Sequence, residues 1–332
     1  MPRRSTVLRL VAVVVAVVAL AAYAVWWSLL AHRFAATVAD WVAARRGEGL
    51  TVETGPMTLS GFPMRVKLVL AAPAFGDKAG NLWRGPPLTL WLPPWAPSTL
   101  HLSAPGIHRF GIAGGTTFTL AAGSASARLR VEAGEFRAAD LIFEEASVGR
   151  LAAQRVVAEA VRLAPGRVGH RVPSLSLTLE ADGLTLPVPP PAGAQPLVLR
   201  LHATAMGWPA PAPVKAALAA WRDDGGTVEL NDVSLRGASV EAAASGTFAL
   251  DGSMQPLFAG TLTTGDSTGM LGALADSGVL DKGAAAVASL ALGALSHRLP
   301  DGSRQTDLPL SVQNRTLSLG PLPLAHLPQL SW

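Results

Sequence analysis

One apolar stretch constrains this chain more than any other feature, because no charged residue occurs between Leu10 and Ala31. At ~1.5 Å per residue the stretch forms about 33 Å of helix, enough to cross the ~30 Å hydrocarbon core of a bilayer. Three arginines precede it, and positively charged flanks stay in the cytoplasm; they are Arg3, Arg4 and Arg9. The pattern predicts a cytoplasmic segment at 1–9, a transmembrane helix at 10–31 and export of the rest.

Aromatic residues near the end of this stretch suit the outer membrane interface, where tryptophan is enriched. Trp26 and Trp27 are the predicted interface residues. A cleaved signal peptide is the alternative, since Ala19-Leu20-Ala21 and Ala22-Tyr23-Ala24 have the small-x-small pattern of cleavage sites. An uncleaved anchor is favoured because apolar residues continue to Leu30 and then recur at helical spacing. We expect a juxtamembrane helix at 32–48 that Gly47 or Gly49 ends.

Composition excludes several classes of protein. Charged residues make up 15% of the 332 residues and apolar residues 49%, which argues against intrinsic disorder. There is no cysteine, so disulfides, thiolate metal sites and thiol nucleophiles are absent. The formal charge is +4, and three of these charges lie before the apolar stretch. No basic stripe follows it, so we expect no nucleic-acid partner.

Beyond Gly49 the dominant pattern is alternation of apolar and polar residues, which is typical of half-buried strands. Turn signals separate the strands every 8 to 15 residues, a spacing that favours antiparallel hairpins over crossover helices. The expected turns are Ser60-Gly61-Phe62-Pro63, Ala104-Pro105-Gly106, Ala181-Asp182-Gly183 and Leu250-Asp251-Gly252. The expected strands are 50–59, 64–71, 88–92, 99–103, 116–121, 127–132, 135–143, 155–163, 174–180, 197–203, 227–236, 240–250, 255–264, 308–312 and 316–319.

Few helices are expected, at 213–223, 270–274 and 284–295. The predicted fold is therefore mainly β (α+β): a transmembrane helix, then an elongated, curved antiparallel sheet with two or three C-terminal helices. Two Pro-rich stretches within 186–213 divide it into an N-terminal β segment at 49–185 and a C-terminal β segment with helices at 214–332. The same stretches are equally compatible with long loops inside one sheet.

A long sheet with one apolar face must cover that face, and the chain supplies few helices to do so. A curved sheet that is partly covered forms an apolar groove, which suits acyl chains. A closed core, made by a second sheet or by curvature, is the alternative.

The segment at 47–70 resembles a known family. An anchor leads into a helix that carries Trp41, followed by a strand, the tetrad Ser60-Gly61-Phe62-Pro63 and then Met64-Arg65-Val66. This order resembles single-anchor envelope proteins of Gram-negative bacteria catalogued as a domain of unknown function and distantly AsmA-like. The C-terminal third is similar too, except that Asn314-Arg315 stands where the resemblance suggests Asn-Gly in a hairpin turn.

The resemblance implies an inner-membrane anchor, a periplasmic β-rich domain and a link to envelope lipid homeostasis, and it carries over no catalytic residue. Its motif residues are Gly61, Phe62, Pro63 and Arg65. A docking element beside the membrane is the functional interpretation of Phe62-Pro63, and a turn with a buried aromatic ring is the structural one.

One motif resembles an esterase nucleophile, because Gly265-Asp266-Ser267-Thr268-Gly269 matches G-x-S-x-G. Asp301 or Asp307 and then His326 follow it in triad order. The expected meander of strands is not the parallel sheet that such an enzyme needs, so a helix-capping turn is the preferred interpretation. No histidine pair has metal-ligand spacing, so no catalytic, cofactor or metal residue is predicted.

The sequence therefore favours a non-enzymatic protein that handles lipid or another apolar envelope molecule in a sheet groove, with the inner membrane as its partner. The alternative is an envelope scaffold with a closed core and an unknown protein partner. A serine hydrolase that uses Ser267 is a distant third.

Overall fold

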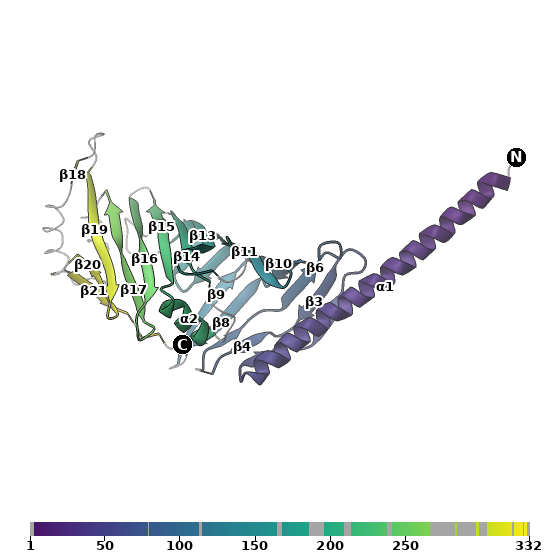
Figure 1. The fold of residues 1–332 in the computed structure, drawn as a ribbon, viewed down its shortest axis with the longest axis horizontal. Helices are drawn as coiled ribbons and strands as arrows, with labels where there is room; N and C mark the ends of the chain where they lie inside the picture. Colours follow the sequence, from purple (N-terminus) through teal and green to yellow (C-terminus); the bar gives the residue numbers. More distant parts are fainter. Residues whose placement is uncertain are drawn as a thin grey trace. The chain divides into compact units, whose positions relative to one another are not determined.

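The computed structural model is mainly β with one long N-terminal helix, as the alternation and the apolar stretch predict (Figure 1). It describes residues 3–78, 80–112, 115–164, 168–185, 196–208, 214–237, 241–265, 283, 297–298, 304–320, 322–327 and 329–330. The chain forms two compact units. Unit 1 comprises Met1–Thr117 with Ser126–Ala133, and unit 2 comprises Phe118–Ala125 with Gly134–Trp332.

Helix α1 (Arg3–Gly47) is a single continuous helix, so the predicted transmembrane and juxtamembrane helices are one element. Its end has the hydrogen bonds of a Schellman motif: the amide of Gly49 donates to the Arg46 carbonyl and that of Leu50 to the Arg45 carbonyl. Gly49 has φ of 81°, the left-handed conformation that this cap requires. The predicted stop at Gly47 or Gly49 is confirmed.

In unit 1, α1 is followed by strands that form two antiparallel ladders. One runs in the order β1-β4-β5-β8, and the other in the order β2-β3-β6-β7-β10. The strands are β1 (Thr51–Glu53), β2 (Met57–Ser60), β3 (Val66–Leu70), β4 (Ala74–Gly76), β5 (Leu82–Arg84), β6 (Leu88–Leu92), β7 (Thr99–Ser103), β8 (Gly106–Ile112) and β10 (Ser124–Glu132).

The C-terminal half of α1 packs on the second ladder. Ala31 is fully buried with Val66 and Leu92, and Phe34 and Val38 extend this core onto Leu68 and its neighbours. The alternation of β3 puts its apolar residues on the side of the helix, since Val66, Leu68 and Leu70 are all buried. The residues of α1 from Leu10 to Leu20 are exposed.

Unit 2 is built on a long antiparallel ladder in the order β9-β11-β12-β13-β14-β15-β16-β17-β19-β20-β21, with β18 on β19. Helix α2 (Val214–Asp223) packs on it through Trp221. The strands are β9 (Thr116–Ala122), β11 (Glu135–Val148), β12 (Leu151–Arg162), β13 (Pro173–Leu184), β14 (Leu197–Met206), β15 (Thr227–Arg236), β16 (Glu241–Leu250), β17 (Pro256–Thr264), β18 (His297–Arg298), β19 (Arg304–Gln313), β20 (Thr316–Leu319) and β21 (Leu322–His326).

Several sequence predictions need correction. The expected turn at Ala181-Asp182-Gly183 is wrong, because β13 continues to Leu184 through a register shift at Gly183, whose φ is 63°. The single strand expected at 50–59 is two strands, because Gly55 at φ of 62° turns the chain between them. The turn at Ser60-Gly61-Phe62-Pro63 is confirmed as the β2–β3 connection.

Of the three expected helices after residue 200, the described residues contain α2. Those expected at 270–274 and 284–295 lie outside the described residues, so a count of two or three C-terminal helices is not matched. The first Pro-rich stretch connects strands that pair with each other, since Leu184 of β13 is in register with Leu197 of β14. That pairing fits a loop within one sheet.

Candidate membrane-proximal site and apolar sheet face

The residues singled out from the sequence meet at one end of the β2–β3 hairpin. On α1, Tyr23 and Trp27 are one helical turn apart, so their side chains lie on one face of the helix. The sequence between β2 and β3 supplies Gly61, Phe62 and Arg65. We call residues 61–65 the hairpin loop.

The hairpin loop depends on glycine at its first position. Gly61 has φ of 102°, and a Cβ added there would lie 2.7 Å from the backbone oxygen of Arg65. The loop closes through the amide of Arg65, which donates to the Gly61 carbonyl at 2.9 Å. The Phe62–Pro63 peptide is cis. Both the conformation and the close approach therefore favour glycine at residue 61.

Two side chains of α1 donate hydrogen bonds to carbonyls of the hairpin loop. The Tyr23 hydroxyl donates to the Pro63 carbonyl at 2.6 Å, and the Trp27 Nε1 donates to the Arg65 carbonyl at 3.1 Å. The Phe62 ring packs edge-on against Trp27, with ring centroids 5.4 Å apart and planes at 88°. It also lies 6.2 Å from the Tyr23 ring. Hydrogen bonds and aromatic contacts together therefore hold the loop against the helix.

The same loop leaves apolar side chains in contact with solvent. Phe62 is 50% exposed and Met64 63% exposed. On the helix, Trp26 is 44% exposed and contacts Tyr23, with ring centroids 5.7 Å apart. Trp26 therefore projects from the helix, whereas Trp27 faces the loop.

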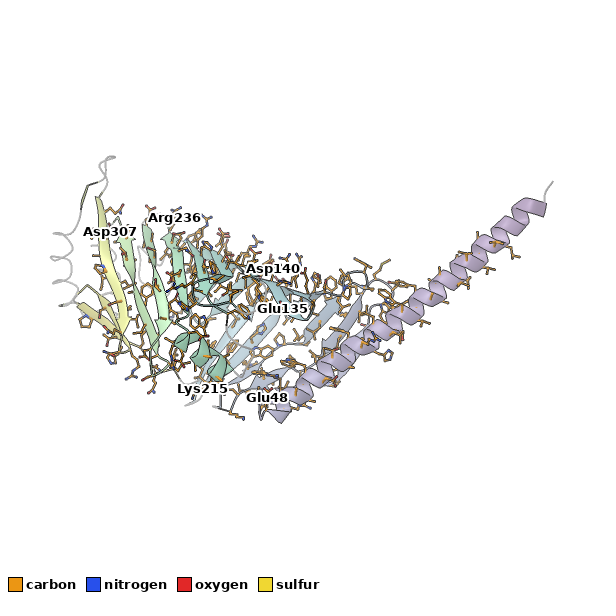
Figure 2. All side chains as sticks on the ribbon, viewed as in Figure 1. Glu48, Glu135, Asp140, Lys215, Arg236 and Asp307 are labelled. Atoms are coloured by element: carbon orange, nitrogen blue, oxygen red, sulfur yellow. The ribbon has the colours of Figure 1, made fainter. Side chains whose placement is uncertain are left out.

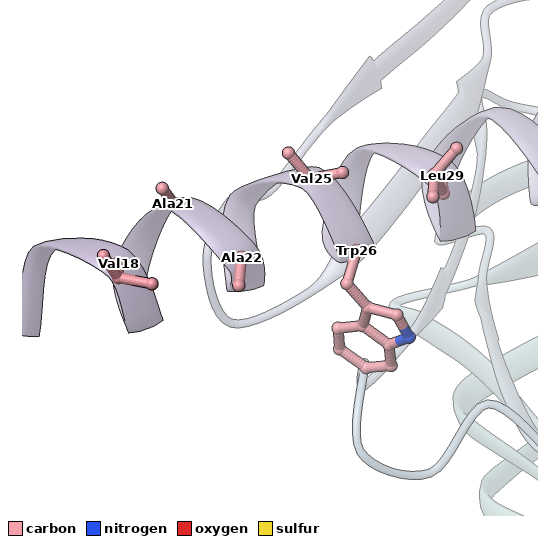
Figure 3. A pocket seen from close by; sticks show the side chains of 6 residues that line it. All are labelled: Val18, Ala21, Ala22, Val25, Trp26 and Leu29. Atoms are coloured by element: carbon pink, nitrogen blue, oxygen red, sulfur yellow. The ribbon is translucent and has the colours of Figure 1, made fainter. Parts of the chain in front are cut away.

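Figure 3 shows Trp26 at one side of a shallow, open depression on α1. Its lining is almost entirely apolar and comes from this helix alone, from Val18, Ala21, Ala22, Val25, Trp26 and Leu29. It lies within the stretch of α1 that is long and apolar enough to cross a membrane. A lining of this kind offers lipid tails a surface, and its one polar side-chain atom is the Trp26 Nε1.

Behind the hairpin loop, a cationic and aromatic row crosses the second ladder. The Arg65 guanidinium lies 5.1 Å from the centre of the Trp91 ring, and Trp91 stacks on His101 at 3.8 Å with the planes 5° apart. Lys67 is in register with Trp91, and His101 with Arg128. Burial and the neighbouring Arg128 charge lower the pKa of His101, because both disfavour the imidazolium.

Sequence reasoning did not identify this row, nor the role of Tyr23. In the sequence, Trp91 is one of several tryptophans and lies beside Pro93-Pro94. The alternation of apolar and polar residues along β6 and β7 could have identified this row. Trp91 and His101 occupy positions of the polar face rather than of the face that packs on α1.

Unit 2 carries a second candidate, an apolar row that runs in register across eight strands. Each member pairs with the next, so all lie on one face; they are Leu141, Ala158, Leu179, Leu201, Val233, Ala244, Leu262 and Leu308. Seven spacings of ~4.8 Å give the row a width of about 34 Å. All members except Leu308 are only half-buried. We call this side of the ladder the apolar face.

The opposite side of the same strands is more polar, although it also carries Ile142 and Val157. One residue along from the apolar row, the paired positions are Asp140, Glu159, Thr178, His202 and Asp232. Figure 2 labels Asp140 on β11. Next to this row, Arg200 and Glu180 form a salt bridge at 2.8 Å. The two faces of the ladder therefore differ in character over five strands.

Helix α2 packs on one end of the apolar face. Its Trp221 is buried with Leu250 and Met254, against Val228 and Phe248. The Trp221 Nε1 donates to the Met206 carbonyl at 2.8 Å. The row that includes Leu179 and Leu201 lies outside this cluster.

In the described part of the chain, no contact brings together the residues considered for an esterase triad. Ser267 and Asp301 lie outside the described residues. Asp307 accepts a hydrogen bond from Thr263 at 2.7 Å, and His326 lies 3.3 Å from the Thr316 hydroxyl on the neighbouring strand. In the described part of the chain no group of His, Asp and Glu could hold a metal ion.

Comparison with known proteins gives one match. Residues 27–328 match the family described as uncharacterized protein conserved in bacteria (DUF2125), a range that begins at Trp27 and includes the hairpin loop and all three ladders. No curated protein and no solved structure matches the chain.

Proposed function

The chain belongs to the DUF2125 family of bacterial proteins, whose description names no activity, and from that premise we propose a non-enzymatic role in lipid handling. In this proposal α1 anchors the protein in the inner membrane and the folded units lie in the periplasm. Unit 2 binds lipid, or another apolar envelope molecule, on its apolar face.

The observation that carries the proposal is the contrast between two adjacent rows of one ladder. The apolar row is half-buried from Leu141 to Val233, whereas the paired row from Asp140 to Asp232 on the other side of the same five strands is charged or polar. Apolar surface gains roughly 25 cal/mol for each Å² removed from water, so a face of this extent favours an apolar occupant. An acyl chain fits such a surface because it needs no hydrogen bonds.

The proposed location in the inner membrane is inferred from the N-terminal helix. Its stretch from Leu10 onward is long and apolar enough to cross a membrane. The arginines at positions 3, 4 and 9 place its N-terminus in the cytoplasm by the positive-inside rule. The AsmA-like relation implied by the sequence resemblance agrees with a role in envelope lipid homeostasis.

Site-specific photocrosslinking in living cells tests the proposal on the full chain. A benzophenone amino acid replaces Leu179 or Leu201 on the apolar face, in cells whose lipids carry ³²P-phosphate. Matched controls place the same group at Thr178 or His202, which are adjacent in sequence and exposed on the polar face. We expect a labelled lipid adduct from the leucine positions and none from the controls.

Equal adducts from both faces, or adducts from neither, would contradict the proposal. Discrete protein adducts at Leu179 and Leu201 without lipid would instead favour the scaffold alternative, in which a partner protein covers this face. Membrane insertion is scored separately in the same cells by alkaline extraction, so loss of the anchor is distinguished from loss of lipid binding.

A further inference from the structure

We propose that the hairpin loop inserts into the bilayer that α1 crosses, in the leaflet from which the folded chain emerges. The occupant of this surface is therefore phospholipid. The inference rests on the proposed membrane anchor and adds a second, non-helical point of contact with the membrane.

First, the exposed apolar part of α1 is too short to cross the membrane without the residues that hold the loop. From Leu10 to Ala22 the residues of α1 are exposed, and they give about 20 Å of helix at ~1.5 Å per residue. A hydrocarbon core of ~30 Å needs about 10 Å more. The next residues, Tyr23 to Trp27, are those that hold the loop. An α1 that fills the core therefore brings the loop to the depth of the membrane boundary, and a tilted helix brings it deeper.

The second argument is the surface of the hairpin. Its exposed side chains include Met57, Leu59, Phe62 and Met64, with Met64 the most exposed at 63%. Four apolar side chains on one short hairpin form a patch of the kind that marks an interaction site. The Tyr23 ring contacts both the exposed Trp26 ring and the exposed Phe62 ring, so one lipid surface can cover both.

The third argument concerns backbone polar groups. Non-helical backbone at membrane depth is tolerated only where its polar groups are satisfied within the protein. Here the Pro63 carbonyl accepts from Tyr23, and the Arg65 carbonyl accepts from Trp27. The Arg65 amide donates to Gly61, and Pro63 has no amide hydrogen. The two bonds from α1 and the one within the loop satisfy three of its five carbonyls and one of its four amides, which lowers the cost of placing this loop in an apolar medium.

Positively charged residues lie at the end of the hairpin loop and on the strands of the second ladder. Arg65 ends the loop, Lys67 follows on β3, and Arg128 lies further along the same row. At the level of the headgroups these cations attract anionic phospholipid. The proposed arrangement is an apolar tip in the acyl chains with a cationic band at the phosphates.

Because the chain has no cysteine, single-cysteine variants label single sites. A nitroxide is attached to the full-length protein at Met64→Cys, and the protein is reconstituted in vesicles of phosphatidylethanolamine and phosphatidylglycerol. Collision with oxygen, which concentrates in acyl chains, is compared with collision with a polar nickel chelate. The reference sites are Val14→Cys, in the exposed part of α1, and Glu53→Cys, on β1 beside the other end of α1.

We expect the oxygen-to-chelate ratio at residue 64 to exceed that at residue 53 several-fold and to approach that at residue 14. A fourth site, Met57→Cys, lies at the far end of β2, about 10 Å further from the loop at ~3.3 Å per residue. Its ratio should fall between those of residues 64 and 53.

A ratio at residue 64 equal to that at residue 53, with residue 14 in lipid, overturns this inference and leaves the anchor intact. A low ratio at residue 14 as well overturns the anchor itself. Substitution of an exposed methionine removes no core contact, so the labelled protein is expected to fold. Circular dichroism of each variant checks that its strand content is unchanged.

Discussion

The Trp27 Nε1 donates a hydrogen bond to the backbone carbonyl of Arg65, 38 residues further along the chain. Four residues earlier on α1, the Tyr23 hydroxyl reaches the Pro63 carbonyl in the same way. Two donors on one helix face thus match two carbonyls of one loop. This match connects the apolar helix to the hairpin loop of the first unit.

Replacing Trp27 with phenylalanine keeps a ring against Phe62 and removes the donor to Arg65. We expect the free energy of unfolding to fall by about 1 kcal/mol, the usual net value of one hydrogen bond. Thermal unfolding of the full chain in detergent measures the change. Trp26→Phe is the matched control and should change stability by less than about 0.5 kcal/mol, because this side chain is 44% exposed. Equal effects of the two substitutions would contradict the assignment.

Gly61→Ala combines a left-handed backbone with a Cβ placed 2.7 Å from the Arg65 oxygen. We expect a loss of about 2–4 kcal/mol, measured by chemical denaturation. Gly252→Ala is the control, since a Cβ there meets nothing within 4 Å. If Gly61→Ala causes no loss in the free energy of unfolding, the loop can change its conformation while it keeps its contacts with α1.

The β19–β20 turn carries Asn314 and Arg315 at φ of 50° and 59°, between the paired residues Gln313 and Thr316. This is the conformation of a two-residue hairpin turn that favours Asn-Gly. Arg315→Gly relieves the positive φ of a residue with a Cβ, so we expect a gain of about 0.5–1 kcal/mol after the entropic cost of glycine. A lower thermal midpoint for this variant would mean that the Arg315 side chain contributes contacts of its own.

His101 should make stability depend on pH. Its pKa is lowered in the folded state by burial and by Arg128. The unfolded state therefore binds more protons near and below the ordinary value of ~6.5, so stability rises with pH through this window and falls on acidification. Arg128→Met should raise the His101 pKa and reduce the slope, as followed by NMR titration of the ring. An unchanged pKa in Arg128→Met would exclude the Arg128 charge as a cause.

Ser174 is fully buried, and its hydroxyl lies 3.0 Å from the Ala205 carbonyl and 2.6 Å from the Gly207 carbonyl. Ser174→Ala leaves these acceptors without that donor, and we expect a loss of about 1–2 kcal/mol in chemical denaturation. Ser176→Ala on the same strand is the control. A larger loss from the control than from Ser174→Ala would argue against this role.

Local alternation of apolar and polar residues predicted the bounds of several strands. The strands at 88–92, 99–103, 227–236 and 316–319 have the predicted bounds. Short strands without alternation, such as Ala74–Gly76 and Leu82–Arg84, were missed because three residues carry too little pattern. Gly183 was interpreted as a turn signal, although pairing on both sides of β13 holds it inside a strand.

The sequence by itself determined the apolar helix, the β-rich class and the residues that share a strand face, because these follow from periodicity along a single segment. Only the tertiary structure decided that Tyr23 and Trp27 meet Pro63 and Arg65, and that leucines of separate strands align as one row. Such pairings depend on register and on packing between distant segments, and a one-residue slip would place every side chain of a strand on the other face.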